Sequence, residues 1–166
     1  MKYVDKLLEE TEYLSYVARL EEQEQNRKFC RHGLSHFLDV ARIAWIKMLE
    51  DENVSIQKKN LEYKEQLYLV ALLHDLGRIQ EYDQGIPHHQ AGSRLARVLL
   101  SQIDYSQKKT EEIIKAIENH RGDYKSNQDL IKRIREADQD SRTCFACKEQ
   151  ETCKWKKEEQ NTVIRW

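Results

Sequence analysis

The chain has 166 residues, enough for one domain that buries about 70% of the surface its unfolded form exposes. Lys and Arg together number 28 and Asp and Glu 29, so there is no basic excess to suggest a nucleic-acid polymer or a membrane as partner. The longest apolar run, Leu67–Leu73, is too short to span a bilayer. Because the first residues also lack the apolar core of a signal peptide, we expect a cytoplasmic protein whose four cysteines are reduced or metal-bound.

The composition favours helices throughout. Five glycines and one proline leave little material for tight turns, while Ala, Leu, Glu, Lys, Gln and Arg are abundant. The helix expected over residues 60–76 is apolar nearly all round from Leu67 to Leu73, which predicts a place in the middle of the core. Gly77 is its expected C-terminal stop. Asn127 is the expected cap of the last helix. The apolar periodicity predicts an all-α fold with helices over residues 3–24, 33–49, 60–76, 89–100, 110–121 and 127–140.

Three of these helices carry a metal-ligating side chain on their apolar stripe. His36 continues the stripe of the second helix, His120 that of the fifth and Asp138 that of the sixth, while His74-Asp75 ends the most buried helix. A lone histidine in such a place is more often a hydrogen-bonded core residue, and Asp138 alone could pair with a nearby arginine. A carboxylate that faces a core is costly unless it is paired or metal-bound. Since the three side chains and the pair occur together, the sequence predicts a shared metal site.

The local sequences around these residues resemble the HD-domain metal-dependent phosphohydrolase superfamily. The matching segments are HFLDVA at 36–41, LLHDLGR at 72–78 and EAD at 136–138, in the family order of His, then His-Asp, then a distant Asp. Two further segments, HQAGSRLA at 89–96 and AIENHRG at 116–122, are similar to stretches of the two-metal branch of that family.

This resemblance implies a helical bundle of about six to seven helices that holds one or two divalent transition metals, such as iron, manganese or zinc. It leaves His32 and His88 without an assigned role. The first metal would be held by His36, His74, Asp75 and Asp138, and the second by His89 and His120, with Asp75 bridging the two.

The resemblance also implies hydrolysis of a phosphate ester or phosphoanhydride of a small, nucleotide-like substrate, with a metal-activated hydroxide as the nucleophile. Asp75 and Arg78 are the expected catalytic residues, and Arg78, Arg121 and Arg94 are the cations expected to contact phosphate. The one-metal nucleotidases of the superfamily carry a glutamate where Arg78 stands, which argues against their mechanism. Two alternatives stay open: a sensor module that retains the metal site without turnover, and oxygen-dependent di-iron chemistry.

A short, charged extension at residues 144–166 follows the helical domain, which we assign to residues 1–143, and is expected to pack on it. It holds three of the four cysteines in a C-x2-C-x5-C spacing, at Cys144, Cys147 and Cys153.

The fourth cysteine, Cys30, lies six residues before His36, just as Cys144 lies six residues after Asp138. If His36 and Asp138 share a metal on antiparallel helices, both cysteines project to the same end of the bundle. The sequence therefore predicts a four-thiolate site. Structural zinc fits the C-x2-C knuckle, while free thiols and an iron–sulfur cluster remain alternatives, although the spacing does not match common ferredoxin patterns.

Overall fold

The computed structural model describes residues 1–121 and 129–166, and every regular element in these ranges is a helix. The all-α prediction is therefore confirmed. Four short 3-10 helices accompany the α-helices: η1 (Ile56–Lys58), η2 (Cys144–Ala146), η3 (Gln150–Thr152) and η4 (Lys157–Glu159). The α-helices are α1 (Lys2–Glu9), α2 (Tyr13–Gln23), α3 (Leu34–Glu50), α4 (Leu61–Leu73), α5 (Arg78–Gln84), α6 (His88–Gln102), α7 (Gln107–Asn119) and α8 (Asp129–Asp140).

The first predicted helix is in fact two. The hydroxyl of Thr11 donates to the carbonyl of Leu7 (2.6 Å) and accepts from the N–H of Tyr13 (3.2 Å), so it serves the end of α1 and the start of α2. A hydroxyl that bonds the backbone in this way offers the chain an alternative to a continuous helix. The prediction of one helix over residues 3–24 was wrong for this reason.

Gly77 does not act as a left-handed stop. Helix α4 ends earlier, at Leu73, and Gly77 lies at the start of the unpredicted helix α5 with φ −65°. A Cβ at Gly77 would stand 2.0 Å from the carbonyl oxygen of His88 and 2.2 Å from the nitrogen of Gly92. Glycine is required here because the beginning of α5 lies directly against the backbone of α6.

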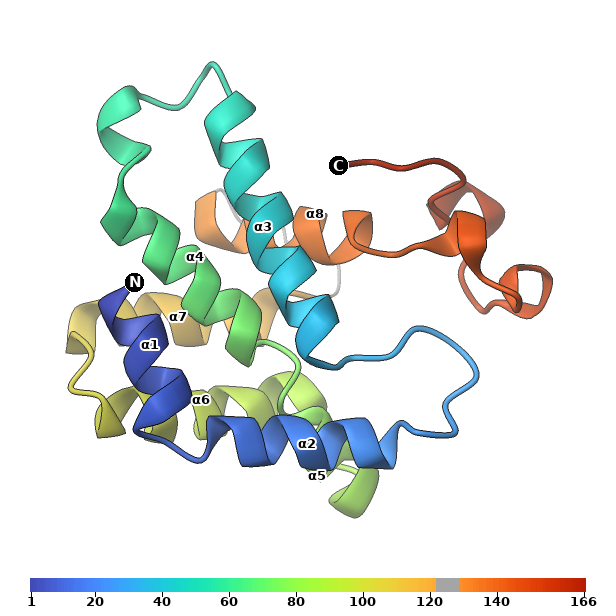
Figure 1. Ribbon diagram of the computed structural model, residues 1–166, viewed down its shortest axis with the longest axis horizontal. Coiled ribbons are helices and arrows are strands. Elements are labelled where there is room, and N and C mark those ends of the chain that lie inside the picture. The colour runs from blue at the N-terminus through green and yellow to red at the C-terminus, as the bar shows by residue number, and fades with distance from the viewer. Residues whose placement is uncertain (122–128) are drawn as a thin grey trace.

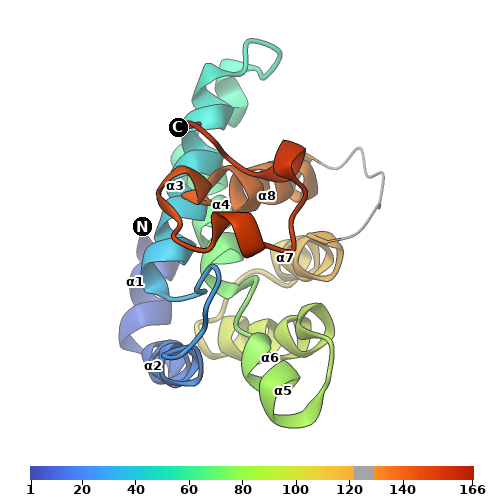
Figure 2. The same ribbon diagram turned by 90° about the vertical axis from the view of Figure 1, so that its right-hand side faces the viewer.

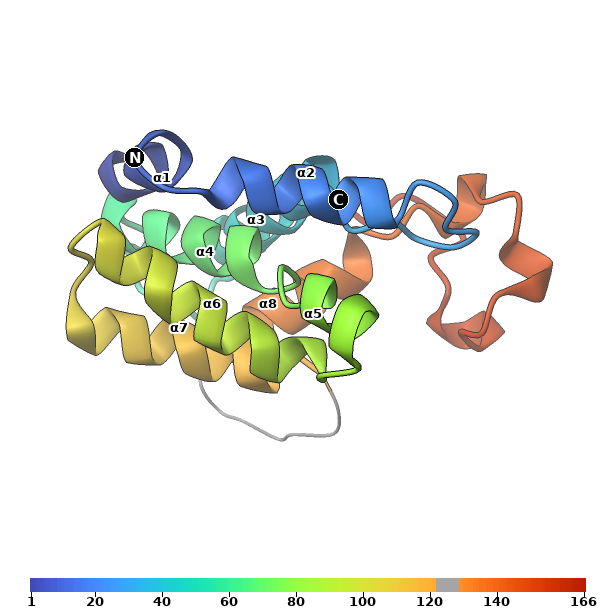
Figure 3. The ribbon, with the colours of Figure 1, turned by 90° about the horizontal axis from the view of Figure 1, so that it is seen from below.

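The core is built around α4, as its apolar sequence predicts. All of its residues from Leu69 to Leu73 are buried, and it packs against α1, α3, α7 and α8 (Figure 1). Helices α6 and α7 lie side by side, as Figure 3 shows from below, and α5 packs on α6. Within the described ranges, no helix is long and apolar enough to cross a membrane.

The segment after α8 runs across one end of the bundle, next to the loop that joins α2 to α3 (Figure 2). Its anchor is Asn161, whose side-chain amide donates to the carbonyls of Gln139 (2.8 Å), Asp140 (3.2 Å) and Arg142 (2.9 Å). The predicted cap of the last helix, Asn127, lies outside the described residues.

Candidate metal centre

Five of the six histidines gather around one buried carboxylate, Asp75, which is 1% exposed. They come from distant parts of the chain: the loop before α3, α3 itself, the end of α4, the first residue of α6 and the end of α7. Four of them approach Asp75 through Nε2, at 3.7 Å for His32, 3.6 Å for His74, 3.5 Å for His88 and 3.6 Å for His120.

One group of ligand atoms matches the predicted first site. Donor atoms of His36, His74 and Asp75 lie within 4.8 Å of one another. Asp138 joins them from α8, with its Oδ1 3.5 Å from His36 Nε2. The structure thus brings together all four residues predicted for the first metal.

A second group shares Asp75 and contains His120, but its other member is His88 and not His89. Donor atoms of Asp75, His88 and His120 lie within 4.8 Å of one another. His89 is half-buried and borders a different hollow, so the prediction for it is corrected. Successive side chains of a helix point about 100° apart, so only one of two adjacent histidines can face Asp75.

The apolar periodicity of the sequence could not make this choice. Starting from His88, the positions three, seven and eleven residues later are Ala91, Leu95 and Leu99, all apolar and all buried. The same steps from His89 give Gly92, Ala96 and Leu100, which are also small or apolar and buried, so the periodicity does not separate the two histidines.

The histidines are oriented as metal ligands require. His74 Nδ1 donates to the carbonyl of Ala71 (2.7 Å) and His120 Nδ1 to the carbonyl of Ile117 (2.6 Å), and a carbonyl can only accept. The proton is therefore on Nδ1, and the lone pair is on Nε2. This is the usual support of a metal-binding imidazole.

The inward-facing atoms have no other partner. Among the described residues, Nε2 of His36, His74, His88 and His120 and Oδ1 of Asp75 are buried without a hydrogen bond. Buried polar groups are rarely left in this state unless an ion or water completes them. The donor set therefore fits one or two divalent metals.

The protonation states fit as well. Burial lowers the pKa of His74 and His88 to about 4, and it also lowers the pKa of His36, so these imidazoles are neutral at pH 7. Burial opposes ionisation of Asp75, but Arg78 and His74 hold the pKa of its carboxyl well below the usual range. Neutral imidazoles around an ionised carboxylate are the forms that bind metal.

Two of the three predicted phosphate-binding arginines lie near this centre. Arg78 is buried and pairs with Asp75 through Nε at 2.9 Å, while its Nη2 has no hydrogen-bond partner in the described part of the chain. Arg121 is exposed and borders the cavity next to Asp138. Arg94 instead lines the hollow beside His89, away from Asp75, and the prediction for it is corrected.

His32 is a member of the site that the periodicity could not reveal, since it precedes α3 and lies on no helical stripe. It is buried, and its Nδ1 lies 2.8 Å from Glu24 Oε1 while Nε2 faces Asp75. Burial opposes ionisation of Glu24, but the hydrogen bond from His32 contributes to lowering the pKa of its carboxyl to about 2. The hydroxyl of Tyr82 also donates to Glu24, at 2.5 Å.

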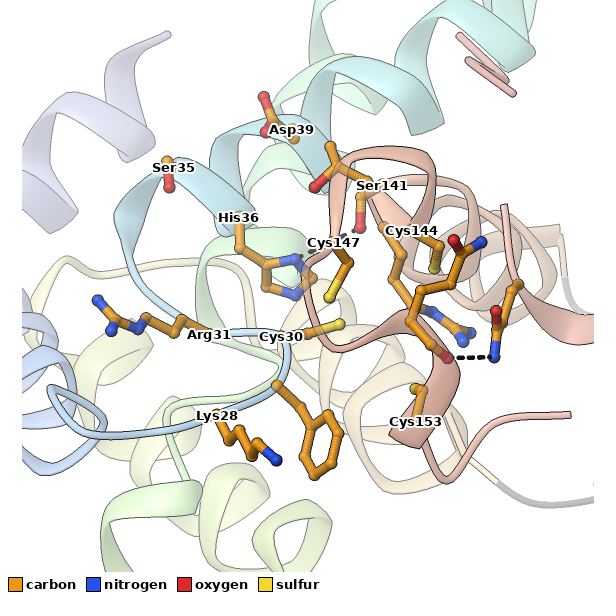
Figure 4. A pocket seen from close by; sticks show the side chains of 15 residues that line it. Lys28, Cys30, Arg31, Ser35, His36, Asp39, Ser141, Cys144, Cys147 and Cys153 are labelled. Carbon is orange, nitrogen blue, oxygen red and sulfur yellow. Dashed lines mark hydrogen bonds between the residues drawn. The ribbon is translucent and has the colours of Figure 1, made fainter. Parts of the chain in front are cut away.

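The predicted cysteine site lies beside this centre. All four cysteines, Cys30, Cys144, Cys147 and Cys153, border one cavity that also touches His36 (Figure 4).

Comparison with known proteins identifies this arrangement. The sequence pattern of the HD domain matches residues 33–159, which span most of the chain and include every histidine of the centre except His32. The chain belongs to the HD domain family. It is 36% identical over 158 residues to an "Uncharacterized protein" of Clostridium beijerinckii, with 95% of each chain covered.

A solved structure shares the HD fold. It is the crystal structure of a predicted HD superfamily hydrolase from an uncultured Thermotogales bacterium, with a TM-score of 0.60 and 23% sequence identity. The similarity covers 90% of this chain and 79% of that one. The buried His/Asp cluster is thus carried by an HD-type helical bundle.

Proposed function

We propose that this HD-domain protein is a metal-dependent phosphohydrolase that cleaves a phosphate ester or phosphoanhydride of a small, nucleotide-like substrate. The observation that carries the proposal is a pair of ligand groups, joined at Asp75, beside a narrow cavity bordered by four cationic side chains.

His36, His74, Asp75 and Asp138 would hold one metal, and Asp75, His88 and His120 a second. When bound, two divalent ions would neutralise phosphate charge and lower the pKa of water towards neutrality. The chain supplies the fixed geometry, because each of the four imidazoles is held through Nδ1, by Ala71, Ile117, Glu81 or Ser141, and Asp75 is held by Arg78.

The charge of the cationic cavity suits a phosphoryl group. Its cations are Arg27, Arg121, Arg142 and Lys154, and it also touches His36 and Asp138. Charged donors aimed at a phosphoryl group stabilise the negative charge that builds on its oxygens. Arg78 can add a donor from the buried side, since Nε holds Asp75 while Nη2 is left for a substrate oxygen.

The organic part of the substrate has a neighbour in Trp155, which lines the same cavity and is half-buried. The guanidinium carbon of Arg142 lies over its indole ring, 4.1 Å from the ring centroid. A planar aromatic group next to phosphate-binding cations supports a nucleotide-like ligand over a simple sugar phosphate.

His32 is placed to move a proton. Glu24 accepts the hydrogen bond from Nδ1, so Nε2 is the atom that faces the centre, 3.7 Å from Asp75 Oδ2. In its imidazolium form, a histidine that donates Nδ1–H to a carboxylate also carries a proton on Nε2, which it can give to the leaving oxygen as general acids do.

The test is phosphate release by protein loaded with Mn²⁺ or Fe²⁺, from a panel of nucleotides, dinucleoside polyphosphates and sugar phosphates. His88→Ala and His89→Ala form a matched pair of adjacent variants. We expect His88→Ala to lower the metal content from about two per chain towards one and the activity by at least ~10–100-fold, with His89→Ala close to wild type.

An inert panel with fully metal-loaded protein would refute the proposed hydrolysis and favour the sensor module. Full activity and full metal content in His88→Ala would instead refute the second metal group.

A further inference from the structure

The four cysteines surround a cavity that the phosphohydrolase proposal does not use. The cavity has a volume of about 270 Å³ and lies between the extension and the loop that precedes α3. Cys30 reaches it from the loop, while Cys144, Cys147 and Cys153 reach it from the extension (Figure 4). Residues more than 110 positions apart thus present their thiols to one space.

The thiols, as arranged in this structure, are spaced more widely than around a single zinc ion. A tetrahedral zinc site with bonds of about 2.3 Å sets its four sulfur atoms about 3.8 Å apart. Within the described residues, only the two His/Asp groups place three ligand atoms within 4.8 Å of one another, so no three of these sulfurs do. In a polynuclear centre the cysteines bind different metal atoms, so their sulfur atoms stand farther apart than around one ion. Such a centre suits thiols arranged around an open cavity.

The charge distribution also fits a thiolate-bound centre. Burial and the nearby thiols of Cys144, Cys147 and Cys153 raise the pKa of the Cys30 thiol, because four anionic sulfurs repel one another without a cation between them. Lys28, Arg31 and Arg142 line the same cavity, and cations around the rim stabilise a net anionic cluster.

Apolar packing does little to hold the extension. The hydrophobic core ends at Ala137, and in the described residues after α8 only Cys144, Gln160 and Asn161 are buried. Polar contacts join it to the bundle, such as Lys28 with Glu149 at 2.8 Å. Short segments without an apolar core commonly depend on a metal or a covalent link for their fold.

We propose that Cys30, Cys144, Cys147 and Cys153 bind an iron–sulfur cluster of the [4Fe–4S] type, which fastens the extension to the loop before α3. Each thiol loses its proton and ligates one iron. Cys30, Cys153 and Arg142 also border the cationic cavity, but the inference does not require the proposed phosphohydrolase activity.

The test uses the full chain, purified without oxygen and reconstituted with iron salts and sulfide. Acid-labile sulfide separates the two sites, because metal bound by the histidines brings none. We expect roughly four sulfides per chain, with the visible absorbance of iron–thiolate bonds, and no bound zinc at the cysteines. Cys30→Ser and Cys147→Ser should each lose the labile sulfide, whereas Ser35→Ala, on the rim of the same cavity, should keep it.

Cysteine-dependent zinc without labile sulfide would overturn the proposal, and so would a reconstituted wild-type chain that holds no sulfide. A Cys30→Ser variant that keeps the full sulfide content would refute the membership of Cys30. Circular dichroism and the metal content of the histidine site show whether a variant is still folded. If neither cysteine variant folds, the sulfide content of the wild-type chain decides whether the cluster is present.

Discussion

Removing the metals should make the stability of the protein depend strongly on pH between 7 and 5. Burial lowers the pKa of His74 and His88 to about 4, against 6.5 for an exposed histidine. Between these values the unfolded chain binds protons that the folded chain does not. The stability is therefore highest above pH 6.5 and falls progressively as the pH drops towards 4.

The size of this effect follows from the two pKa values. One pKa unit corresponds to 1.36 kcal/mol, so a shift from 6.5 to about 4 is worth about 3 kcal/mol for each histidine once the pH is below 4. Between pH 7 and pH 5 the loss is about 2 kcal/mol for each, or about 4 kcal/mol together. That is a large part of the ~5–15 kcal/mol by which a typical domain is stable. His36, whose pKa is also lowered by burial, adds to the loss.

The assay is urea unfolding of the chelated protein at pH 7, 6 and 5, followed by circular dichroism. The carboxyls of Asp75 and Asp138 do not contribute in this window, because their pKa values are lowered from 3.8. His88→Gln should remove about 2 kcal/mol of this loss, the share of one histidine. An unfolding free energy that stays flat from pH 7 to pH 5 in the chelated wild type would refute the reasoning.

Three further predictions concern single side chains. Gly77→Ala should lower the free energy of unfolding by about 2–3 kcal/mol or more, because the new Cβ would lie 2.0 Å from a backbone oxygen. Urea or thermal melts would measure this, and Gly92→Ala, with its nearest contact at 3.4 Å, should cost less. Arg121→Ala should raise KM for the phosphorylated substrate with the metal content unchanged, and an equal effect of Arg94→Ala would contradict the placement of the cationic cavity. Asn161→Ala removes three hydrogen bonds to carbonyls and should weaken the anchoring of the extension by about 1–3 kcal/mol, which limited proteolysis would detect as faster cleavage after α8.

Much of the site could be predicted from sequence alone. His36, His120 and Asp138 each continue an apolar stripe, and a stripe must face the core, so their side chains had to converge on the end of the buried helix that carries His74 and Asp75. The same periodicity gave the all-α class and the central position of α4. These features depend on the 3.6-residue repeat, which is a local property of the chain.

Other features of the site were decided only by the tertiary structure, because they depend on distances between elements that no local repeat encodes. His32 joins the centre from a loop, where no periodicity applies, and its placement rests on a hydrogen bond to Glu24. His88 takes the place predicted for His89 because the start of α6 is fixed in rotation by backbone contact with Gly77. The cysteine spacing indicated a shared site, but the separation of the sulfurs, which distinguishes one ion from a cluster, is set by how the extension packs on the bundle.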